Sequence, residues 1–200
     1  MEDVGEEFLD LPDTADGDPT LVWSEVFGDE HPVQIELGIG KGRFILDAAA
    51  RLPEVNFVGV EWAAKYLRIA RHRAGRRQLD NIRFVHTDAR EFIELFVPTA
   101  SVQAYHIYFP DPWPKKRHHK RRLFDKYFLR EVERTLKTDG QLWLATDFAD
   151  YFEVMLEVLR TSRVLNVIDA EWLGVKTNYE EKYIALNKPI YRRVLKKSEL

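Results

Sequence analysis

The sequence contains no cysteine. This absence excludes disulfide bonds, thiolate nucleophiles and cysteine-ligated zinc or iron–sulfur sites, and it removes any sign of an oxidising compartment. Long apolar runs are also absent, and the N-terminus lacks the basic-then-apolar order of a signal peptide. We therefore expect a cytoplasmic protein that does not enter the membrane.

Basic residues are missing from the first thirty positions, which hold eleven Asp or Glu. Residues 31–200 therefore carry all 30 Lys and Arg against 22 acidic side chains, a formal charge of +8. A basic body predicts an anionic partner, whereas the acidic tail, rich in Gly, Pro and Asp, predicts poor order at least through Pro19 and a solubilising role. At 200 residues and 45% hydrophobic content, we expect a tail at 1–30 and a single domain at 31–200.

From Val33 onward, short apolar runs alternate with longer amphipathic segments, which is typical of a parallel sheet between helices in an α/β fold. The pattern predicts strands at 33–37, 55–60, 82–86, 102–109, 140–146 and 163–168. It predicts helices at about 42–51, 63–78, 89–95, 123–137 and 149–161. Near the C-terminus, 183–186 and 190–195 indicate either a hairpin or a last strand with a bend.

Three glycines, Gly38, Gly40 and Gly42, alternate between the first predicted strand and the first predicted helix. Glycine allows a sharp turn and close approach of a ligand at the carboxyl end of a parallel strand. Dinucleotide sites generally use G-x-G-x-x-G, whereas here an acid, Glu36, precedes G-x-G-x-G and would repel a pyrophosphate. The motif favours a cationic ligand over NAD, and S-adenosylmethionine has positive sulfonium and amino groups and no phosphate.

Acidic residues also follow the next two predicted strands. Glu61 is placed to accept both ribose hydroxyls of the cofactor, and Asp88 is placed to contact the adenine amino group. Taken alone, either acid is most simply a helix cap or a solvated side chain. Three acids at three successive strand ends form one constellation, and that recurrence favours a cofactor site.

The segment from Tyr108 to Arg122 combines Asp111 between two prolines, Trp113, and a run of cationic or titratable residues. A rigid loop of this kind can present a carboxylate and a flat ring to a base, while the basic run neutralises phosphates. Alternatively, Asp111 only initiates a turn, and Trp113 packs on the core. The RNA-contacting candidates are Trp113, Lys116, Arg117, His118, His119, Lys120, Arg121 and Arg122, and we expect no metal site.

These motifs resemble the bacterial tRNA guanine-N7 methyltransferase family, and the resemblance runs from about Val33 to Arg193. It is carried by the residues 36–42, the acids Glu61 and Asp88, the segment 109–123, and the residues Thr146-Asp147 and 177–180. The resemblance implies methyl transfer from S-adenosylmethionine to N7 of guanine 46 in the tRNA variable loop. It also implies a Rossmann-like class I methyltransferase fold, with a seven-stranded, mostly parallel sheet, helices on both faces and a C-terminal antiparallel hairpin.

The resemblance also implies roles for individual residues. The cofactor-binding set is Glu36, Gly38, Gly40, Gly42, Glu61, Asp88 and Asp111, and the substrate-binding set is Lys115, Asp147, Thr177, Asn178, Tyr179 and Glu180. Guanine N7 carries a lone pair and no proton, so the catalytic residue Asp111 is not a base; we expect it to accept hydrogen bonds from guanine N1–H and the exocyclic amine. From the sequence alone, Asp147 is either a helix N-cap or a substrate contact.

Other interpretations remain open at this level. The chain could methylate another RNA or a protein, or it could be a noncatalytic RNA-binding relative, and it could be a monomer or a homodimer. The predicted helix 63–78 is rich in Lys and Arg, and their spread around its turns favours solvated faces over an RNA-binding patch.

Overall fold

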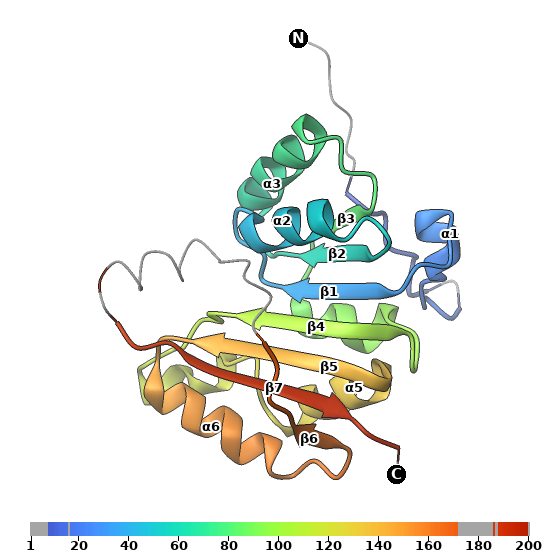
Figure 1. Ribbon diagram of the computed structural model, residues 1–200. Helices are drawn as coiled ribbons and strands as arrows, with labels where there is room; N and C mark the ends of the chain where they lie inside the picture. The colour runs from blue at the N-terminus through green and yellow to red at the C-terminus, as the bar shows by residue number, and fades with distance from the viewer. Residues whose placement is uncertain (1–7, 16, 172–185, 187, 200) are drawn as a thin grey trace. The chain divides into compact units, whose positions relative to one another are not determined.

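The computed structural model describes residues 8–15, 17–171, 186 and 188–199 (Figure 1). The chain divides into two compact units, Met1–Pro98 and Thr99–Leu200. Among the described residues, no helix combines the length and apolar character that a membrane span requires.

Unit 1 contains three parallel strands, in which β2 pairs with both β1 and β3. All five residues of β2 are buried, because helices cover a parallel sheet and its strands are then apolar throughout. The strands and the two long helices match the predicted elements closely. Their bounds are β1 Val33–Leu37, α2 Arg43–Arg51, β2 Asn56–Val60, α3 Ala64–Arg76 and β3 Ile82–Val85.

The helix predicted at 89–95 divides into two pieces. The short helix α4 covers Ala89–Glu91, and a π-helical turn follows over Phe92–Phe96. Phe92, Ile93 and Phe96 are all buried in that turn, and the rings of Phe92 and Phe96 stack 6.3 Å apart. The apolar pattern therefore predicted the burial of this segment correctly, but it did not predict the change from an α-helix to a π-helix.

Part of the acidic N-terminal segment contacts β3 and the π-helical turn of unit 1, which the composition did not predict. The backbone N–H of Leu9 donates to the Phe84 carbonyl at 2.8 Å, and that of Leu21 donates to the Phe96 carbonyl at 2.8 Å. A short helix, α1 (Trp23–Phe27), follows, and the guanidinium of Arg83 lies 4.9 Å from the Phe27 ring. The role of the tail stays a prediction.

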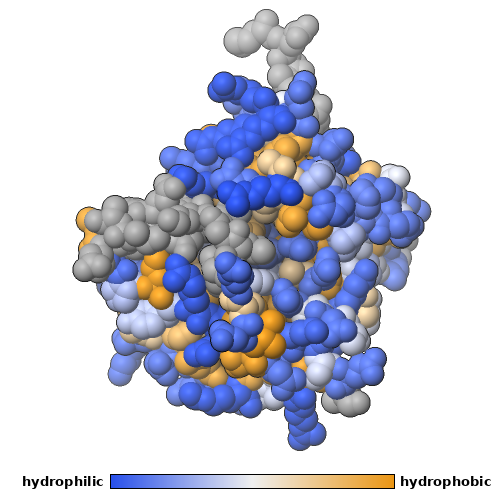
Figure 2. Space-filling model, in the orientation of Figure 1, coloured by the Kyte–Doolittle hydropathy of each residue, from blue (hydrophilic) through white to orange (hydrophobic). Residues whose placement is uncertain are grey.

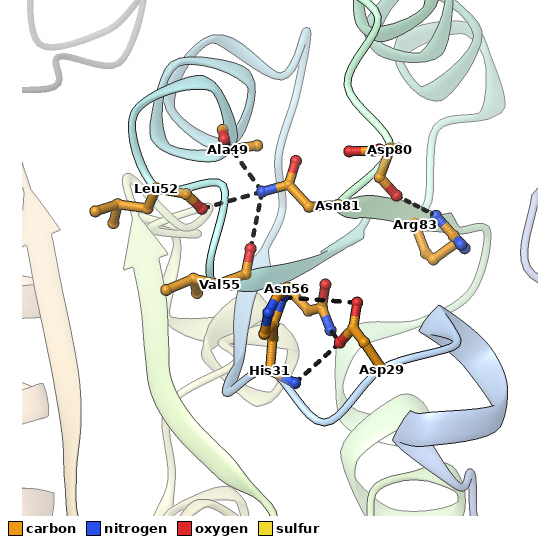
Figure 3. Close-up of polar contacts among 9 residues, drawn as sticks. All are labelled: Asp29, His31, Ala49, Leu52, Val55, Asn56, Asp80, Asn81 and Arg83. Carbon is orange, nitrogen blue, oxygen red and sulfur yellow. Dashed lines mark hydrogen bonds and ion pairs between the residues drawn. The ribbon is translucent and has the colours of Figure 1, made fainter.

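Polar side chains secure the amino ends of β2 and β3, at the opposite end of these strands from the glycine loop (Figure 3). The buried Asn81 side-chain amide donates to the carbonyls of Ala49, Leu52 and Val55 at 2.8–3.1 Å. Asn56 Nδ2 donates to Asp29 Oδ1 at 2.6 Å. The Asn81 bonds tie the end of α2 and the turn after it to the start of β3, and the Asn56–Asp29 bond holds the segment before β1.

Unit 2 contains the parallel pair β4–β5 and the antiparallel strands β6 and β7. Its elements are β4 Val102–Tyr108, a 3₁₀ helix Lys116–Arg121, α5 Lys126–Thr135, β5 Leu136–Thr146, α6 Ala149–Leu159, β6 Leu165–Val167 and β7 Tyr191–Lys197. The seven strands of the sheet run in the order β3-β2-β1-β4-β5-β7-β6. This confirms the predicted α/β fold, with β6 and β7 as its antiparallel C-terminal hairpin.

Several predicted boundaries in unit 2 differ from the structure: the strand predicted at 140–146 begins at Leu136, and the strand predicted at 163–168 covers only Leu165–Val167. The helix predicted from 123 begins at Lys126, because Asp125 is its N-cap and accepts a hydrogen bond from the Phe128 N–H at 2.9 Å. The hairpin predicted over 183–186 and 190–195 falls partly outside the described residues, which do not include 183–185; Leu186 lies in a turn, and the described strand is β7.

We predict that Gly42→Ala destabilises the protein by about 1–3 kcal/mol. Gly42 has φ +74°, and a Cβ there would lie 2.7 Å from the Ala70 Cβ, where α3 packs against the start of α2. The free energy of unfolding in urea measures the effect. Gly75→Ala is the control: it lies in α3 with no atom within 4 Å of an added Cβ, and it should stabilise by about 0.5–1 kcal/mol. Equal effects of the two substitutions would contradict the packing argument.

Candidate active site

The glycine loop turns the chain sharply between β1 and α2. Gly38, Gly40 and Gly42 have φ values of +80°, +52° and +74°, in a region that other residues rarely adopt. The N–H groups of Gly38 and Ile39 donate to the Val60 carbonyl at 2.8 and 3.2 Å, so the loop crosses the carboxyl end of β2. A Cβ on Gly38 or Gly40 would meet no atom within 4 Å, and this open side leaves space for a ligand against the backbone.

The Glu61 carboxylate joins the glycine loop to the residue before α3. Its Oε2 accepts a hydrogen bond from the Gly40 N–H at 2.9 Å, and its Oε1 accepts one from the Ala63 N–H at 2.9 Å. A carboxylate oxygen has two acceptor lone pairs, so each oxygen can still accept from a hydroxyl group. The predicted ribose contact and the observed structural role are therefore compatible.

Glu36 is an acidic residue that is buried in β1 of unit 1. The residue is 3% exposed, and its Oε2 has no hydrogen-bond partner among the described residues. Burial raises the pKa of the Glu36 carboxyl well above its ordinary value; the Ile45 N–H, in the first turn of α2, offsets part of this shift, and the charge of Glu61 adds to it. A cationic ligand group would supply the missing partner, and the site thus fits the sulfonium and amino groups of S-adenosylmethionine.

Asp88 is the N-cap of α4, which is one of the two interpretations that its sequence position allows. Its Oδ1 accepts hydrogen bonds from the N–H groups of Arg90 at 2.8 Å and Glu91 at 3.3 Å. The residue is exposed, and the cap uses Oδ1, so Oδ2 can accept a bond from a ligand. The predicted contact with the adenine amino group stays a prediction.

Trp62 is an exposed aromatic residue beside the candidate site, and the sequence pattern did not single it out. It directly follows Glu61 and is 71% exposed, the largest exposed fraction among the bulky apolar residues that the structure describes. Its backbone carbonyl is 2.8 Å from His86 Nε2, and the two rings lie 6.3 Å apart. The available signal was a bulky aromatic residue immediately after a strand-end acid, and an exposed indole there offers a surface on which a flat ring can stack.

In unit 2, the Asp111 loop starts directly after β4 with unusual backbone angles. Phe109 has φ +51° and Trp113 has φ +42°, a conformation that costs non-glycine residues roughly 1–3 kcal/mol each. The Phe109 N–H donates to the Ala145 carbonyl of β5 at 2.7 Å, which fixes the start of the loop. Asp111 is exposed, so its carboxylate is available to a substrate.

Trp113 is half-buried, so its exposure lies between that expected of a ring that stacks on a base and that of a ring packed in the core. The His118 ring meets it edge-on at 5.8 Å, and the Arg121 guanidinium lies 5.0 Å from its centroid. Arg121 therefore covers part of the indole through a cation–π contact. The indole is held by the basic segment that follows it in the sequence.

Arg122 departs from the phosphate-binding role that the basic run suggests. It is 7% exposed, its Nε donates to the Pro112 carbonyl at 2.8 Å, and its guanidinium lies 4.8 Å from the Tyr151 ring. Tyr151 is fully buried, and its hydroxyl accepts a hydrogen bond from the Phe124 N–H at 3.1 Å. Arg122 thus holds the Asp111 loop from inside. The exposed cations of the run are Lys115, Lys116, Arg117, Lys120 and Arg121, with His119 also exposed and His118 half-buried.

Asp147 lies at the carboxyl end of β5, next to the end of β4, because these strands pair in parallel. The N-cap interpretation of Asp147 is wrong, since α6 begins at Ala149 and its N-cap is Phe148. The Phe148 N–H instead donates to Thr146 Oγ1 at 3.2 Å. The predicted substrate residues 177–180 lie outside the described part of the chain, and within that part no group of acids and histidines could hold a metal.

Solved structures of similar fold define the class of the protein. The 16S rRNA methyltransferase KamB matches with a TM-score of 0.64 at 12% identity, covering 88% of this chain and 93% of that one. TrmN from Thermus thermophilus matches with a TM-score of 0.60 at 21% identity, covering 87% of this chain and 46% of that one. These similarities show the fold alone, and that fold is the class I methyltransferase fold.

Sequence comparisons define the family within this class. The family model described as "Putative methyltransferase" matches residues 30–193. The tRNA (guanine-N(7)-)-methyltransferase of Listeria monocytogenes serotype 4b is 41% identical over 85% of this chain and 82% of its own length. The Bacillus subtilis protein of the same name is 35% identical over 85% and 83%. The chain belongs to the tRNA (guanine-N7)-methyltransferase family.

We predict that Glu36→Gln weakens S-adenosylmethionine binding by about 10- to 100-fold, because a charge-assisted contact is lost. The same change should stabilise the protein without cofactor at neutral pH. The folded state holds the Glu36 proton more tightly than the unfolded state, so the wild-type free energy of unfolding falls as pH rises from about 4.5 through the raised folded-state pKa. Gln at position 36 does not titrate in this range, so the variant should not lose this free energy of unfolding as pH rises.

Urea unfolding between pH 4 and 8, with calorimetric titration of the cofactor, measures both effects. Glu153→Gln in α6 is the control, since Glu153 is exposed and should change neither quantity. A Glu36→Gln variant with wild-type cofactor affinity would remove Glu36 from the binding site.

We predict that Arg122→Ala lowers the free energy of unfolding by about 1–3 kcal/mol, because it removes a hydrogen bond and a cation–π contact beneath the loop. Lys120→Ala, an exposed neighbour, should change it by less than about 0.5 kcal/mol. Thermal and urea unfolding distinguish the two. If both variants unfold like the wild type while Arg122→Ala binds RNA poorly, Arg122 is a surface contact after all.

Proposed function

We propose that this protein transfers the methyl group of S-adenosylmethionine to N7 of a guanine in tRNA, with guanine 46 of the variable loop as its target. The observation that carries this proposal is the buried Glu36 carboxylate, which has an unpartnered oxygen beside the glycine loop. In a chain of this family, such a group calls for a positively charged ligand and not for a phosphate-bearing nucleotide.

The carboxyl ends of β1, β2 and β3 would hold the cofactor. Glu36 pairs with its positive charge, Glu61 accepts from its ribose hydroxyls, and Asp88 accepts from its adenine amino group. Beside Gly38 and Gly40 there is space for the part of the cofactor that would lie against the protein backbone. When bound, the cofactor supplies an electrophilic methyl group on a sulfonium, and the chain has only to orient it.

On the substrate side, the chain has no proton to remove, since N7 attacks through a lone pair. Asp111 accepts hydrogen bonds from guanine N1–H and the exocyclic amine, which aligns the base for in-line transfer. Its negative charge also stabilises the positive charge that the purine gains as the new N–C bond forms. The strained backbone at Phe109 and Trp113 holds Asp111 in place before the base arrives.

The tRNA backbone is the anion for the exposed cations of the segment Lys115–Arg121. The 3₁₀ helix Lys116–Arg121 presents several of them within two turns, directly after the Asp111 loop. Phosphate contacts of this kind position a nucleic acid without reading its sequence, so base identity is left to Asp111. A tRNA substrate places the reaction in the cytoplasm.

The proposal is tested by methyl transfer from labelled S-adenosylmethionine to unmodified tRNA transcripts. The wild-type protein should label a transcript with guanine at position 46 and not one with adenine there, and chemical cleavage at N7-methylguanosine should map the product to that position. Label elsewhere would change the target, and no label despite cofactor binding would reject the activity.

Asp111→Asn in the same assay should lower kcat about 100- to 1000-fold with little change in tRNA affinity, because the aligning acceptor and its charge are removed while the phosphate contacts remain. The control is Asp150→Asn, an exposed residue in the first turn of α6, which should leave turnover unchanged.

A further inference from the structure

Four basic or titratable residues form a single line along α3. Lys65, Arg68, His72 and Arg76 recur at intervals of three and four residues, which places them on one face of an α-helix. All four are exposed. The face opposite to them is the buried one, which carries Leu67, Ala70 and Ala74. We call this line of four residues the α3 stripe. In the view of Figure 2, the surface in the region of α3 is mostly hydrophilic, with hydrophobic side chains showing beside it.

No acidic residue balances the α3 stripe within its own helix, since residues 62–79 contain no Asp or Glu. Like charges at i, i+3 or i, i+4 destabilise a helix by roughly 0.2–0.5 kcal/mol per pair. Within the described part of the chain, Lys65, Arg68 and Arg76 make no ion pair with a carboxylate. Helix α3 thus keeps a row of like charges that weakens the helix and that its folding does not require.

Two other arginines of the segment have structural roles, which separates them from the α3 stripe. Arg73 Nη1 donates to the Lys41 carbonyl of the glycine loop at 3.1 Å, and Arg77 pairs with Asp47 of α2 at 2.5 Å. These contacts, with the close approach of Gly42 to Ala70, fix α3 against the glycine loop and α2. The α3 stripe is therefore a rigid surface with a fixed relation to the cofactor end of unit 1.

We propose that the α3 stripe binds tRNA phosphates, as a second anion-binding surface besides the segment Lys115–Arg121. The inference rests on the proposed tRNA substrate. From Lys65 to Arg76 the stripe spans about 16 Å at 1.5 Å per residue, long enough to meet several phosphates of one strand. The stripe itself carries no carboxylate or amide group, so it recognises backbone charge and not base edges.

The test compares tRNA binding by the wild type and by Lys65→Gln/Arg68→Gln/Arg76→Gln across a range of salt concentrations. Gln keeps helix propensity while it removes three charges. The slope of log K against log salt should become less steep by about 2 to 3, and affinity near 0.1 M salt should fall about 10- to 100-fold. Cofactor affinity should be unchanged. The unfolding midpoint should not fall, because like-charge repulsion is relieved.

A matched control removes the same charge elsewhere: Arg51→Gln/Lys137→Gln/Arg160→Gln replaces three exposed cations on different elements. This variant should keep nearly the wild-type slope. The charge-preserving variant Lys65→Arg/Arg68→Lys/Arg76→Lys should also bind like the wild type, because phosphates respond to the charge and not to the group that carries it.

An α3 variant with the wild-type salt slope, or a control with an equal loss, would overturn the inference, since net charge alone would then explain binding. Failure of the proposed function is distinguishable, because it appears as absence of methyl transfer by the wild-type protein. If the wild type methylates tRNA and the α3 variant binds tRNA with unchanged affinity, only the proposed role of the α3 stripe is rejected.

Discussion

The Glu61 carboxylate accepts hydrogen bonds from the backbones of Gly40 and Ala63, and the arrangement of the glycine loop and the start of α3 depends on this pair of contacts. One bond holds the glycine loop in its left-handed turn, and the other holds the chain as it enters α3. The close packing of Gly42 on Ala70 then joins that helix to α2. A single side chain therefore fixes both the glycine loop and the start of α3, and the ribose contact proposed for Glu61 would use the same carboxylate.

Glu36 shows the opposite relation between stability and function. A buried carboxyl group without a full set of partners weakens a fold, and the raised pKa of Glu36 reflects that cost. Its position at the carboxyl end of a parallel strand is where α/β folds bind ligands. A cationic ligand would remove this cost on binding, so the relief of the cost would add to the affinity.

In unit 2, neighbouring cations of one run have different surroundings and so different roles. Arg121 covers the Trp113 ring from outside, whereas Arg122 turns inward to the Pro112 carbonyl and the Tyr151 ring. The strained loop that presents Asp111 is thus supported on two sides. Under the proposed function, a loop supported in this way would let the Asp111 carboxylate align a base without rearrangement, which is what a reaction that needs no general base requires.

The sequence by itself determined the order of strands and helices, the glycine loop, the acids at the strand ends and the family, because these depend on local apolar periodicity and on motifs of adjacent residues. Only the tertiary structure decided which side chains are exposed. Arg122 is buried beside Tyr151, whereas Trp62 is left open beside Glu61. Burial and partner choice arise from contacts between residues far apart in the chain, and no local pattern records them.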